Sequence, residues 1–371
     1  MKLSLPTSEL LSALGAATRV ASTRSAVQAL SGVLIDAEQE RCELQATDME
    51  VGVRVPLDVA PERPGRVVLP GRLLLDVTRA LSGERVSLEL RGSEQDVEVI
   101  SGASTFHLRT LRLDDFPRLP EPEEGGRVIL PAAAFVETVA RVARAASRDE
   151  TRPVLTGIWM AASGQELLMV ATDSYRLSVK RTTLAASLQG ELEANVPARA
   201  LGELSRIAQQ GNGEDAELAV SVRQGQVLFE LHGAVLSSRV IDGQFPNYRQ
   251  LLPETVEHEL RLSTAEVADV VRRISLLALK NAPLRLAFSE GELTVSALTA
   301  EVGDAAETIP VPFAGEPFEI GFNPEFLRDG LESVDGEEFV LKLISPLRPG
   351  LICSPEEGEF IYLVMPIRLN T

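Results

Sequence analysis

Two aspartates occupy matching positions in the chain, and their side chains could do acid–base chemistry. Asp48 closes the sequence LQATD, and Asp173 closes the similar sequence MVATD. Paired carboxylates can serve as general acid and general base. The third related sequence, VSALT, ends at Thr299 instead. A repeated turn aspartate usually caps its own backbone, so we expect a structural turn at both positions.

The sequence shows no other pattern typical of catalysis. His107, His232 and His258 lack metal-ligand spacing, and the chain has no G-x-x-x-x-G-K-[ST], G-x-S-x-G or H-E-x-x-H motif. Cys42 and Cys353 are too far apart and too few for a disulfide framework or a zinc site. These observations predict a protein that is not an enzyme, with no catalytic residues, no cofactor and no metal.

The chain contains three related segments, and their fold determines where the residues named above lie. Each segment opens with a short apolar run followed by a helix start, and the matching positions are Pro6, Pro131 and Ser263. A second helix start follows later in each segment, and alternating apolar residues predict antiparallel strands around the helices. We therefore predict an α+β fold of three tandem domains, each with two helices packed on antiparallel sheets. Their boundaries are 1–120, 127–250 and 258–371, and the second helices begin at Pro70, Pro197 and Pro324.

The charge is strongly unbalanced, with 36 basic and 54 acidic residues and a formal net charge of −18. A uniformly spread negative charge would disfavour nucleic acid, but binding depends on where the charges lie. Arginines recur at helical spacing, which is typical either of a solvated helix face or of a surface for phosphates. Spacings of three, four and four residues would place on one helix face Arg141, Arg144, Arg148 and Arg152. Pairs seven residues apart are Arg72 with Arg79 and Arg199 with Arg206.

Three segments carry a resemblance to a known family. ATDSYRL (171–177), DGQFPNYR (242–249) and MPIRL (365–369) resemble, in order, segments of the bacterial DNA polymerase III beta subunit, the DNA sliding clamp. The resemblance covers the whole chain. It implies a head-to-tail homodimer that closes into a ring. Such a ring encircles duplex DNA and tethers the replicative polymerase and other replication and repair proteins.

The resemblance also implies partners and a DNA-facing surface. The expected partners are double-stranded DNA without sequence specificity, the polymerase III alpha subunit, an ATP-dependent clamp loader and other proteins with a clamp-binding motif. No membrane partner is expected. The resemblance and the charge pattern together predict that the DNA-facing residues are Arg24, Arg72, Arg141, Arg144, Arg148, Arg152, Arg199 and Arg206.

Two further sites follow from the resemblance. A peptide-binding pocket between the second and third domains is formed by Leu155, Thr172, Ser174, Tyr175, Arg176, Leu177, Pro246, Gln250, Leu251, Leu363, Met365, Pro366, Ile367, Arg368 and Leu369. Its departures from the family pattern, which would shift peptide preference, are Ser174, Tyr175, Gln250 and Ile367. The dimer seam is formed by Val77, Leu81, Arg109, Ile274, Leu277 and Glu307.

Three other interpretations stay open at this point. The first is a hydrolase whose site has no local signature, and the second is a monomeric peptide-binding repeat protein. The third is a specialised clamp paralogue, for example one that confers antibiotic resistance through an altered pocket. No run of about 18 apolar residues predicts a membrane span, and the two scattered cysteines suit a reducing compartment. We therefore expect a cytoplasmic, nucleoid-associated protein.

Overall fold

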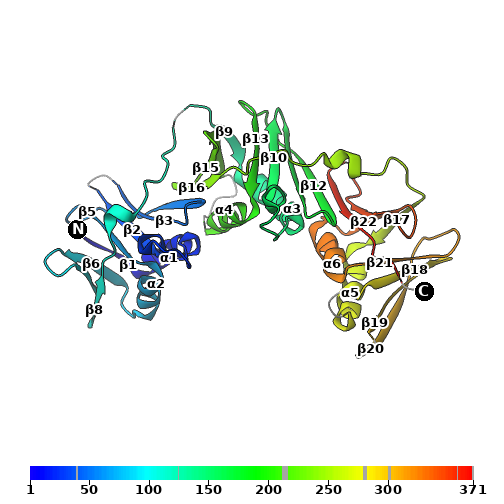
Figure 1. The fold of residues 1–371 in the computed structure, drawn as a ribbon, viewed down its shortest axis with the longest axis horizontal. Coiled ribbons are helices and arrows are strands. Elements are labelled where there is room, and N and C mark those ends of the chain that lie inside the picture. The colour runs from blue at the N-terminus through cyan, green and yellow to red at the C-terminus, as the bar shows by residue number, and fades with distance from the viewer. Residues whose placement is uncertain are drawn as a thin grey trace. The chain divides into compact units, whose positions relative to one another are not determined.

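The computed structural model describes residues 1–38, 41–123, 125–210, 216–278, 282–299, 302–356 and 358–369 (Figure 1). The chain divides into two compact units. The first unit comprises Met1–Val136 and Leu188–Val240, and the second comprises Glu137–Ser187 and Ile241–Thr371. The division passes through the middle of the chain's central segment, so we describe each unit by itself.

The helices begin where the sequence predicts. In the first unit, α1 (Thr7–Val20), α2 (Gly71–Ala80) and α4 (Ala198–Gln210) each start directly after a proline. Helix α3 (Ala132–Val142) also follows a proline. Proline is tolerated at a helix start because the first helical N–H groups have no intrahelical partner.

Helices α5 and α6, both in the second unit, are capped by side chains. Before α5 (Thr264–Ile274), the Ser263 hydroxyl accepts a hydrogen bond from the Glu266 N–H at 3.4 Å. Before α6 (Pro324–Ser333), the Asn323 side chain accepts from the N–H groups of Glu325 at 2.8 Å and Phe326 at 3.2 Å. These bonds satisfy N–H groups that the first helical turn leaves free.

Antiparallel sheets support the helices of the first unit. Helices α1 and α2 pack on each other, and α1 contacts β3 and β4. One sheet has the order β1 (Lys2–Pro6), β6 (Arg85–Arg91), β7 (Asp96–Ser101) and β8 (Ser104–Arg109). A larger sheet has the order β5 (Gly65–Pro70), β2 (Gly32–Ala37), β3 (Cys42–Thr47), β4 (Val51–Pro56), β16 (Ala234–Arg239), β15 (Gln226–Leu231), β14 (Glu217–Arg223) and β9 (Val128–Pro131). Strand β13 (Leu192–Pro197) leads into α4.

The second unit is built in the same way. Helices α5 and α6 pack on each other, and α6 contacts β24. Hydrogen-bonded neighbours follow the order β10 (Gly157–Ser163), β11 (Glu166–Thr172), β12 (Arg176–Thr183), β24 (Phe360–Val364), β23 (Gly350–Cys353), β22 (Glu338–Leu343) and β17 (His258–Ser263). A four-stranded sheet has the order β20 (Gly303–Pro310), β19 (Glu292–Thr299), β18 (Leu284–Ser289) and β21 (Phe318–Phe322).

One helix is shorter than the arginine spacing predicts. Helix α3 ends at Val142, and a single 3-10 turn follows over Ala143–Ala145. Arg148 and Arg152 therefore lie beyond the helix, and the prediction of four arginines on one helix face is wrong. The Asp149 carboxylate accepts the N–H of Thr151 at 3.0 Å, which stabilises a turn instead of a helix. Pro153 also disfavours helical backbone at Arg152, which has φ −122° and ψ 70°.

Within the part of the chain that the structure describes, no helix is both long enough and apolar enough to span a membrane.

Candidate functional site: two strand joins and a cavity

The two matching aspartates form the same turn. The Asp48 Oδ1 accepts hydrogen bonds from the N–H groups of Glu50 and Val51, at 3.0 and 2.8 Å. The Asp173 Oδ1 accepts from the N–H groups of Tyr175 and Arg176, at 2.9 and 3.0 Å. Both carboxylates therefore cap their own backbone, and the expectation of a structural turn is confirmed.

Each turn holds one residue in the left-handed backbone region. Met49 and Ser174 both have φ +80°. This conformation favours glycine, because other side chains crowd the backbone there. It turns the chain sharply at the end of one strand, so the next strand runs back antiparallel beside it, β4 beside β3 and β12 beside β11.

The strand after each turn pairs with a strand from a later part of the chain. We call the pairing of β4 with β16 the first join, and its register runs from Arg54↔Val235 to Val51↔Ser238. The pairing of β12 with β24 is the second join, and its register runs from Arg176↔Val364 to Lys180↔Phe360. Each join continues one sheet across a boundary between repeated segments.

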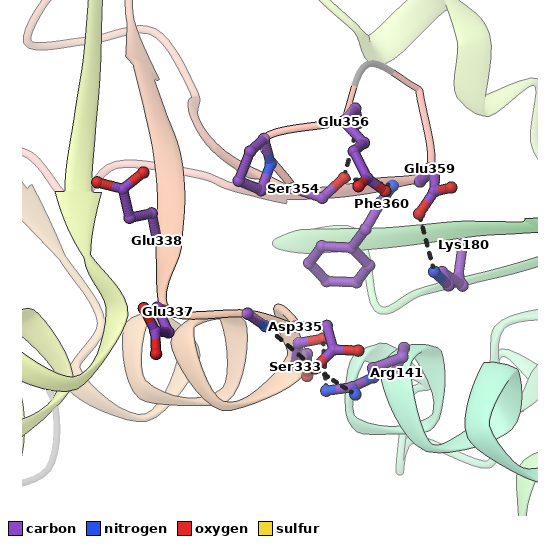
Figure 2. A pocket seen from close by; sticks show the side chains of 12 residues that line it. Arg141, Lys180, Ser333, Asp335, Glu337, Glu338, Ser354, Glu356, Glu359 and Phe360 are labelled. Carbon is purple, nitrogen blue, oxygen red and sulfur yellow. Dashed lines mark hydrogen bonds and ion pairs between the residues drawn. The ribbon is translucent and has the colours of Figure 1, made fainter.

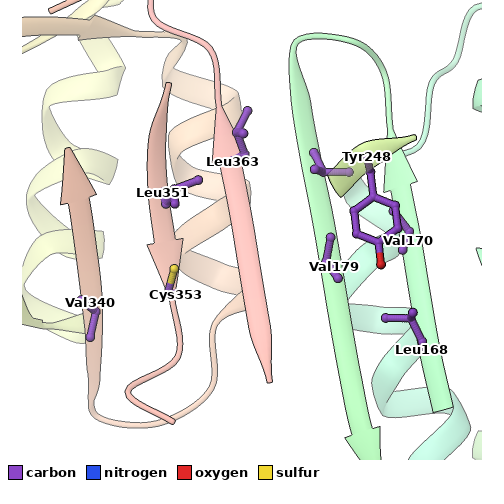
Figure 3. Packing of buried hydrophobic residues seen from close by; sticks show 9 residues of the cluster. Leu168, Val170, Val179, Tyr248, Val340, Leu351, Cys353 and Leu363 are labelled. Carbon is purple, nitrogen blue, oxygen red and sulfur yellow. The ribbon is translucent and has the colours of Figure 1, made fainter. Parts of the chain in front are cut away.

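An apolar cluster lies at the second join (Figure 3). Leu168, Val170, Val179 and Tyr248 come from the central segment of the chain. They belong to the same buried cluster as residues of β22, β23 and β24, namely Val340, Leu351, Cys353 and Leu363. This packing holds the strands that form the walls of a neighbouring cavity.

The cavity at the second join has a volume of about 650 Å³, a size typical of ligand-binding clefts. Its opening carries exposed apolar side chains, since Leu251 is 48% exposed, Leu347 64% and Met365 41%. The complete lining is Thr172, Ser174, Arg176, Leu177, Gln250, Leu251, Leu252, Pro253, Glu254, Thr255, Ile344, Leu347, Arg348, Pro349, Leu363 and Met365.

The sequence prediction matches part of this lining. The predicted residues that line the cavity are Thr172, Ser174, Arg176, Leu177, Gln250, Leu251, Leu363 and Met365. The predicted residues that do not line it are Leu155, Tyr175, Pro246, Pro366, Ile367, Arg368 and Leu369. Leu155 is buried, and the Ile367 N–H donates to the Gly321 carbonyl at 2.7 Å, which pins the C-terminal segment to β21.

Sequence reasoning missed two walls of the cavity. One is the segment Leu252–Thr255, and the other is the connection between β22 and β23, which contributes Ile344, Leu347, Arg348 and Pro349. The second wall carries a readable signal, because the sequence ISPLRPG places exposed apolar residues between two strands where a turn would ordinarily be polar.

Arg176 braces the floor of the cavity from within the fold. Its Nε donates to the Asp173 Oδ2 at 3.0 Å, and its Nη1 donates to the Asp329 Oδ2 at 2.6 Å. The guanidinium also lies 4.3 Å from the centre of the Phe326 ring. Burial alone would lower the pKa of Arg176, but its Tyr362 and Asp329 partners outweigh that effect and hold the pKa above its usual value. The positive charge of Arg176 is therefore neutralised by carboxylates of the protein itself.

A second cavity in the same unit is chemically different (Figure 2). It has a volume of about 520 Å³ and includes the carboxylates of Asp335, Glu337, Glu338, Glu356 and Glu359 in its lining. Its two cations are paired, since Arg141 lies 3.2 Å from Asp335 and Lys180 lies 3.7 Å from Glu359. Charged walls of this kind do not suit an apolar peptide, so the cavity at the second join is the better candidate.

Comparison with known proteins supplies the family. Models of the DNA polymerase III beta subunit match the chain at residues 1–120 for the N-terminal domain, 129–247 for the central domain and 249–368 for the C-terminal domain. The beta sliding clamp of Streptomyces coelicolor is 32% identical over 380 residues, covering 100% of both chains. The chain belongs to the beta sliding clamp family. The clamp of Caulobacter vibrioides is 30% identical over 375 residues, again covering 100% of both chains.

Solved structures agree with this assignment. The sliding clamp of Bacillus subtilis matches with a TM-score of 0.92 at 26% identity, covering 100% of both chains. The clamp of Bartonella birtlesii, solved bound to griselimycin, matches with a TM-score of 0.92 at 28% identity and the same coverage. The chain thus has three tandem clamp domains, and it is a sliding clamp that serves DNA polymerase III as an accessory subunit rather than as an enzyme.

The arginines predicted to face DNA fall into two groups in this clamp. Five are paired with carboxylates of their own chain: Arg141 with Glu137 and Asp335, Arg144 with Asp329 and Glu332, Arg152 with Asp149, Arg199 with Asp48, and Arg206 with Glu203. Arg24, Arg72 and Arg148 are exposed and form no ion pair among the described residues. The free cations are the ones that phosphates can reach without first breaking a contact.

The residues predicted for the dimer seam also differ in exposure. Ile274 is buried with Val267, Val270 and Val271 on the inner face of α5, so its assignment to the seam is wrong. Its neighbour Leu276 is 81% exposed. Arg109 donates to the Glu94 carbonyl at 2.7 Å, and Glu307 pairs with Arg273 at 2.7 Å. Val77, Leu81 and Leu277 are partly buried.

Proposed function

We propose that the cavity at the second join binds short peptide segments of the polymerase III alpha subunit and of other proteins with a clamp-binding motif. The observation that carries this proposal is the open cavity with mixed polar and apolar walls, whose exposed leucines and methionine leave apolar surface in water. A peptide with a few large apolar anchors would bury that surface. A flexible methionine at the opening suits several different partners.

The same proposal places duplex DNA inside a ring of two chains joined head to tail. A sliding ring needs weak, sequence-independent contacts with phosphates, which Arg24, Arg72 and Arg148 can supply. The net charge of −18 keeps the rest of the surface unattractive to DNA. The seam would use Val77, Leu81 and Leu277, with Leu276 in place of Ile274. An ATP-dependent clamp loader would open the ring, and the expected location is the nucleoid in the cytoplasm.

The test compares retention of the loaded clamp on circular DNA and on the same DNA after it is cut. Loss from the cut DNA and retention on the circle, with a dimeric mass in solution, is the expected result. Equal retention on both would mean ordinary surface binding, and the ring would have to be abandoned. A monomeric mass at micromolar concentration would favour a peptide-binding protein that never encloses DNA.

A further inference from the structure

The first join has a small cavity of its own, and two arginines line it. The cavity measures about 120 Å³ and lies within the first unit. Arg118 and Arg239 both line it, both residues are exposed, and neither forms an ion pair among the described residues. The protein has a net charge of −18, so two unpaired cations at one cavity are not what its composition alone would produce.

The corresponding positions of the second join hold neutral residues. The Arg239 N–H donates to a carbonyl of the neighbouring turn at 3.0 Å, and the Met365 N–H makes the same bond at 2.9 Å. Arg118 follows the sequence Phe-Pro, and Asn247 follows the matching Phe-Pro of the central segment. Two arginines at the first join therefore stand where a methionine and an asparagine stand at the second.

The floor of the small cavity is polar. Thr47, Ser237 and Ser238 line it and are buried. The Ser238 hydroxyl donates to the Arg239 carbonyl at 3.1 Å. The Ser237 hydroxyl lies 3.4 Å from the Gly52 carbonyl, which is long for a hydroxyl donor. Because a hydroxyl hydrogen can rotate, Ser237 can donate instead to a closer acceptor in the cavity.

The charge and the size of the cavity both point to a small anion. Glu50 is the acidic residue among those that line it, so the lining carries two cations and one carboxylate. This positive balance favours a negatively charged ligand. The volume is below the range of ordinary ligand pockets, so it suits a group of a few atoms. Phosphate and carboxylate groups are that small, and their oxygens match the donors of an arginine.

We propose that the first join contains a binding site for one small oxyanion, a phosphate or a carboxylate group, held between Arg118 and Arg239. The bound anion would link the segment after β8 to the end of β16, which are distant in the chain. The site goes beyond the proposed peptide binding, because it lies in the first unit and takes a ligand of different chemistry.

The test follows isotope-labelled methionine methyl groups of the full-length protein by NMR. Sodium phosphate is added while sodium chloride keeps the ionic strength constant. Met49 lines the cavity of the first join and Met365 lines that of the second, so their signals report on the two cavities separately. Phosphate should shift the Met49 signal until it saturates and leave the Met365 signal in place.

A second titration distinguishes the two sources of the oxyanion. Acetate carries a single carboxylate and stands in for an acidic side chain of a protein partner. Phosphate should bind more tightly, because its dianion can accept hydrogen bonds from both arginines. Tighter binding of acetate would keep the site and identify an acidic side chain as its natural ligand.

Four variants test the role of each charge. Arg118→Gln and Arg239→Gln should each weaken phosphate binding about tenfold, because one charge-assisted hydrogen bond is lost. Glu50→Gln should tighten binding by about threefold, because a repelling carboxylate is removed. The matched control is Arg249→Gln, an exposed arginine of the second unit with no ion pair among the described residues, and it should change nothing.

Three results would overturn the inference. The first is a Met49 signal that phosphate does not shift to saturation. The second is unchanged phosphate affinity in the double variant of Arg118→Gln and Arg239→Gln, and the third is an equal loss in Arg249→Gln. Both arginines of the site are exposed, so thermal unfolding without phosphate should be the same in the variants and in the unchanged protein.

Discussion

The first join and the second join are built from the same parts but leave very different spaces. At the first join, Gly52 pairs with Ser237, and the side chain of Leu119 lies directly over Gly52. The cavity there measures about 120 Å³. At the second join the equivalent pair is Leu177 and Leu363, and the cavity measures about 650 Å³. The repeated turn fixes where a pocket can form, and the side chains beyond it decide whether one does.

The two joins also differ in the length of the connection between two nearby strands, β14 and β15 in the first unit and β22 and β23 in the second. In the first unit β14 ends at Arg223 and β15 starts at Gln226, so the two strands meet in a tight turn. In the second unit the connection from β22 to β23 spans residues 344–349 and forms one wall of the cavity. A longer connection thus turns a strand pairing into a binding cleft.

Each join also contains a buried arginine, but the two serve different neighbours. Arg54 pairs with Glu43 at 3.0 Å and with Glu121 at 3.2 Å, which ties the segment after residue 120 to the first join. Arg176 pairs with Asp329 and ties α6 to the second join. Both arginines have a buried carboxylate partner, Glu43 at the first join and Asp329 at the second, whereas Glu121 is 72% exposed.

The largest effect should come from removing the buried carboxylate of the second join. Asp329→Ala leaves Arg176 buried without its partner on α6, which costs about 3–5 kcal/mol when one member of a buried pair is lost. Hydrogen exchange should accelerate at β12 and β24 and stay unchanged at β4 and β16. Equal acceleration in both joins would show that they are not independent.

Glu121→Ala is the matched control at the first join, since an exposed ion pair contributes less than about 1 kcal/mol.

Two buried thiols provide a second readout for the Asp329→Ala variant. Burial raises the pKa of Cys42 and of Cys353 to about 11, so both should react slowly with iodoacetamide at neutral pH. Asp329→Ala should speed the reaction of Cys353 and leave that of Cys42 unaltered.

A smaller loss should follow from crowding the first join. In Gly52→Ala the new methyl group would lie 2.7 Å from the Ser237 Oγ and 3.0 Å from a Leu119 methyl carbon. Overpacking of this kind lowers the free energy of unfolding by about 1–3 kcal/mol. Denaturant unfolding measures the loss, and adding Ser237→Ala should recover part of it. No loss in the single variant would mean that Leu119 moves aside freely.

Removing the wall that only the second join has should weaken peptide binding without affecting the fold. Leu347→Ser should reduce the affinity for a short peptide with large apolar anchors about tenfold, or about 1.4 kcal/mol, because one apolar contact is lost. Fluorescence anisotropy measures the affinity. Met49→Ser, an exposed substitution at the corresponding turn of the first join, should leave peptide binding unchanged. A loss in both variants would contradict the assignment of the site to one join.

The smallest effect concerns the strained turn itself. Met49→Gly relieves a left-handed conformation but adds freedom to the unfolded chain, so the free energy of unfolding should rise by less than about 1 kcal/mol. Thermal unfolding can detect the change. Ser174→Gly should gain less, since it also gives up the hydrogen bond that the Arg152 Nη1 donates to the Ser174 hydroxyl at 3.1 Å. A larger gain in Ser174→Gly would argue against a stabilising role for that bond.

The sequence indicated features that are local in the chain. Prolines marked the helix starts, and the repeated Asp48 and Asp173 marked the turns, because each depends on a few adjacent residues. Arginine spacing alone predicts a longer α3, whereas the turn at Asp149 and the proline at 153 predict non-helical backbone there. The second cavity wall and the Arg152–Ser174 bond depend on contacts between distant segments, and single-sequence patterns do not report such contacts.

The joins also have a mechanical meaning. Because β4 pairs with β16 and β12 with β24 through main-chain ladders, each sheet runs on through the boundary between repeated segments. A force that slides these strands past each other acts on several ladder hydrogen bonds at the same time. A flexible linker has no such ladder and would stretch under a smaller force. Each unit should therefore behave as a stiff plate.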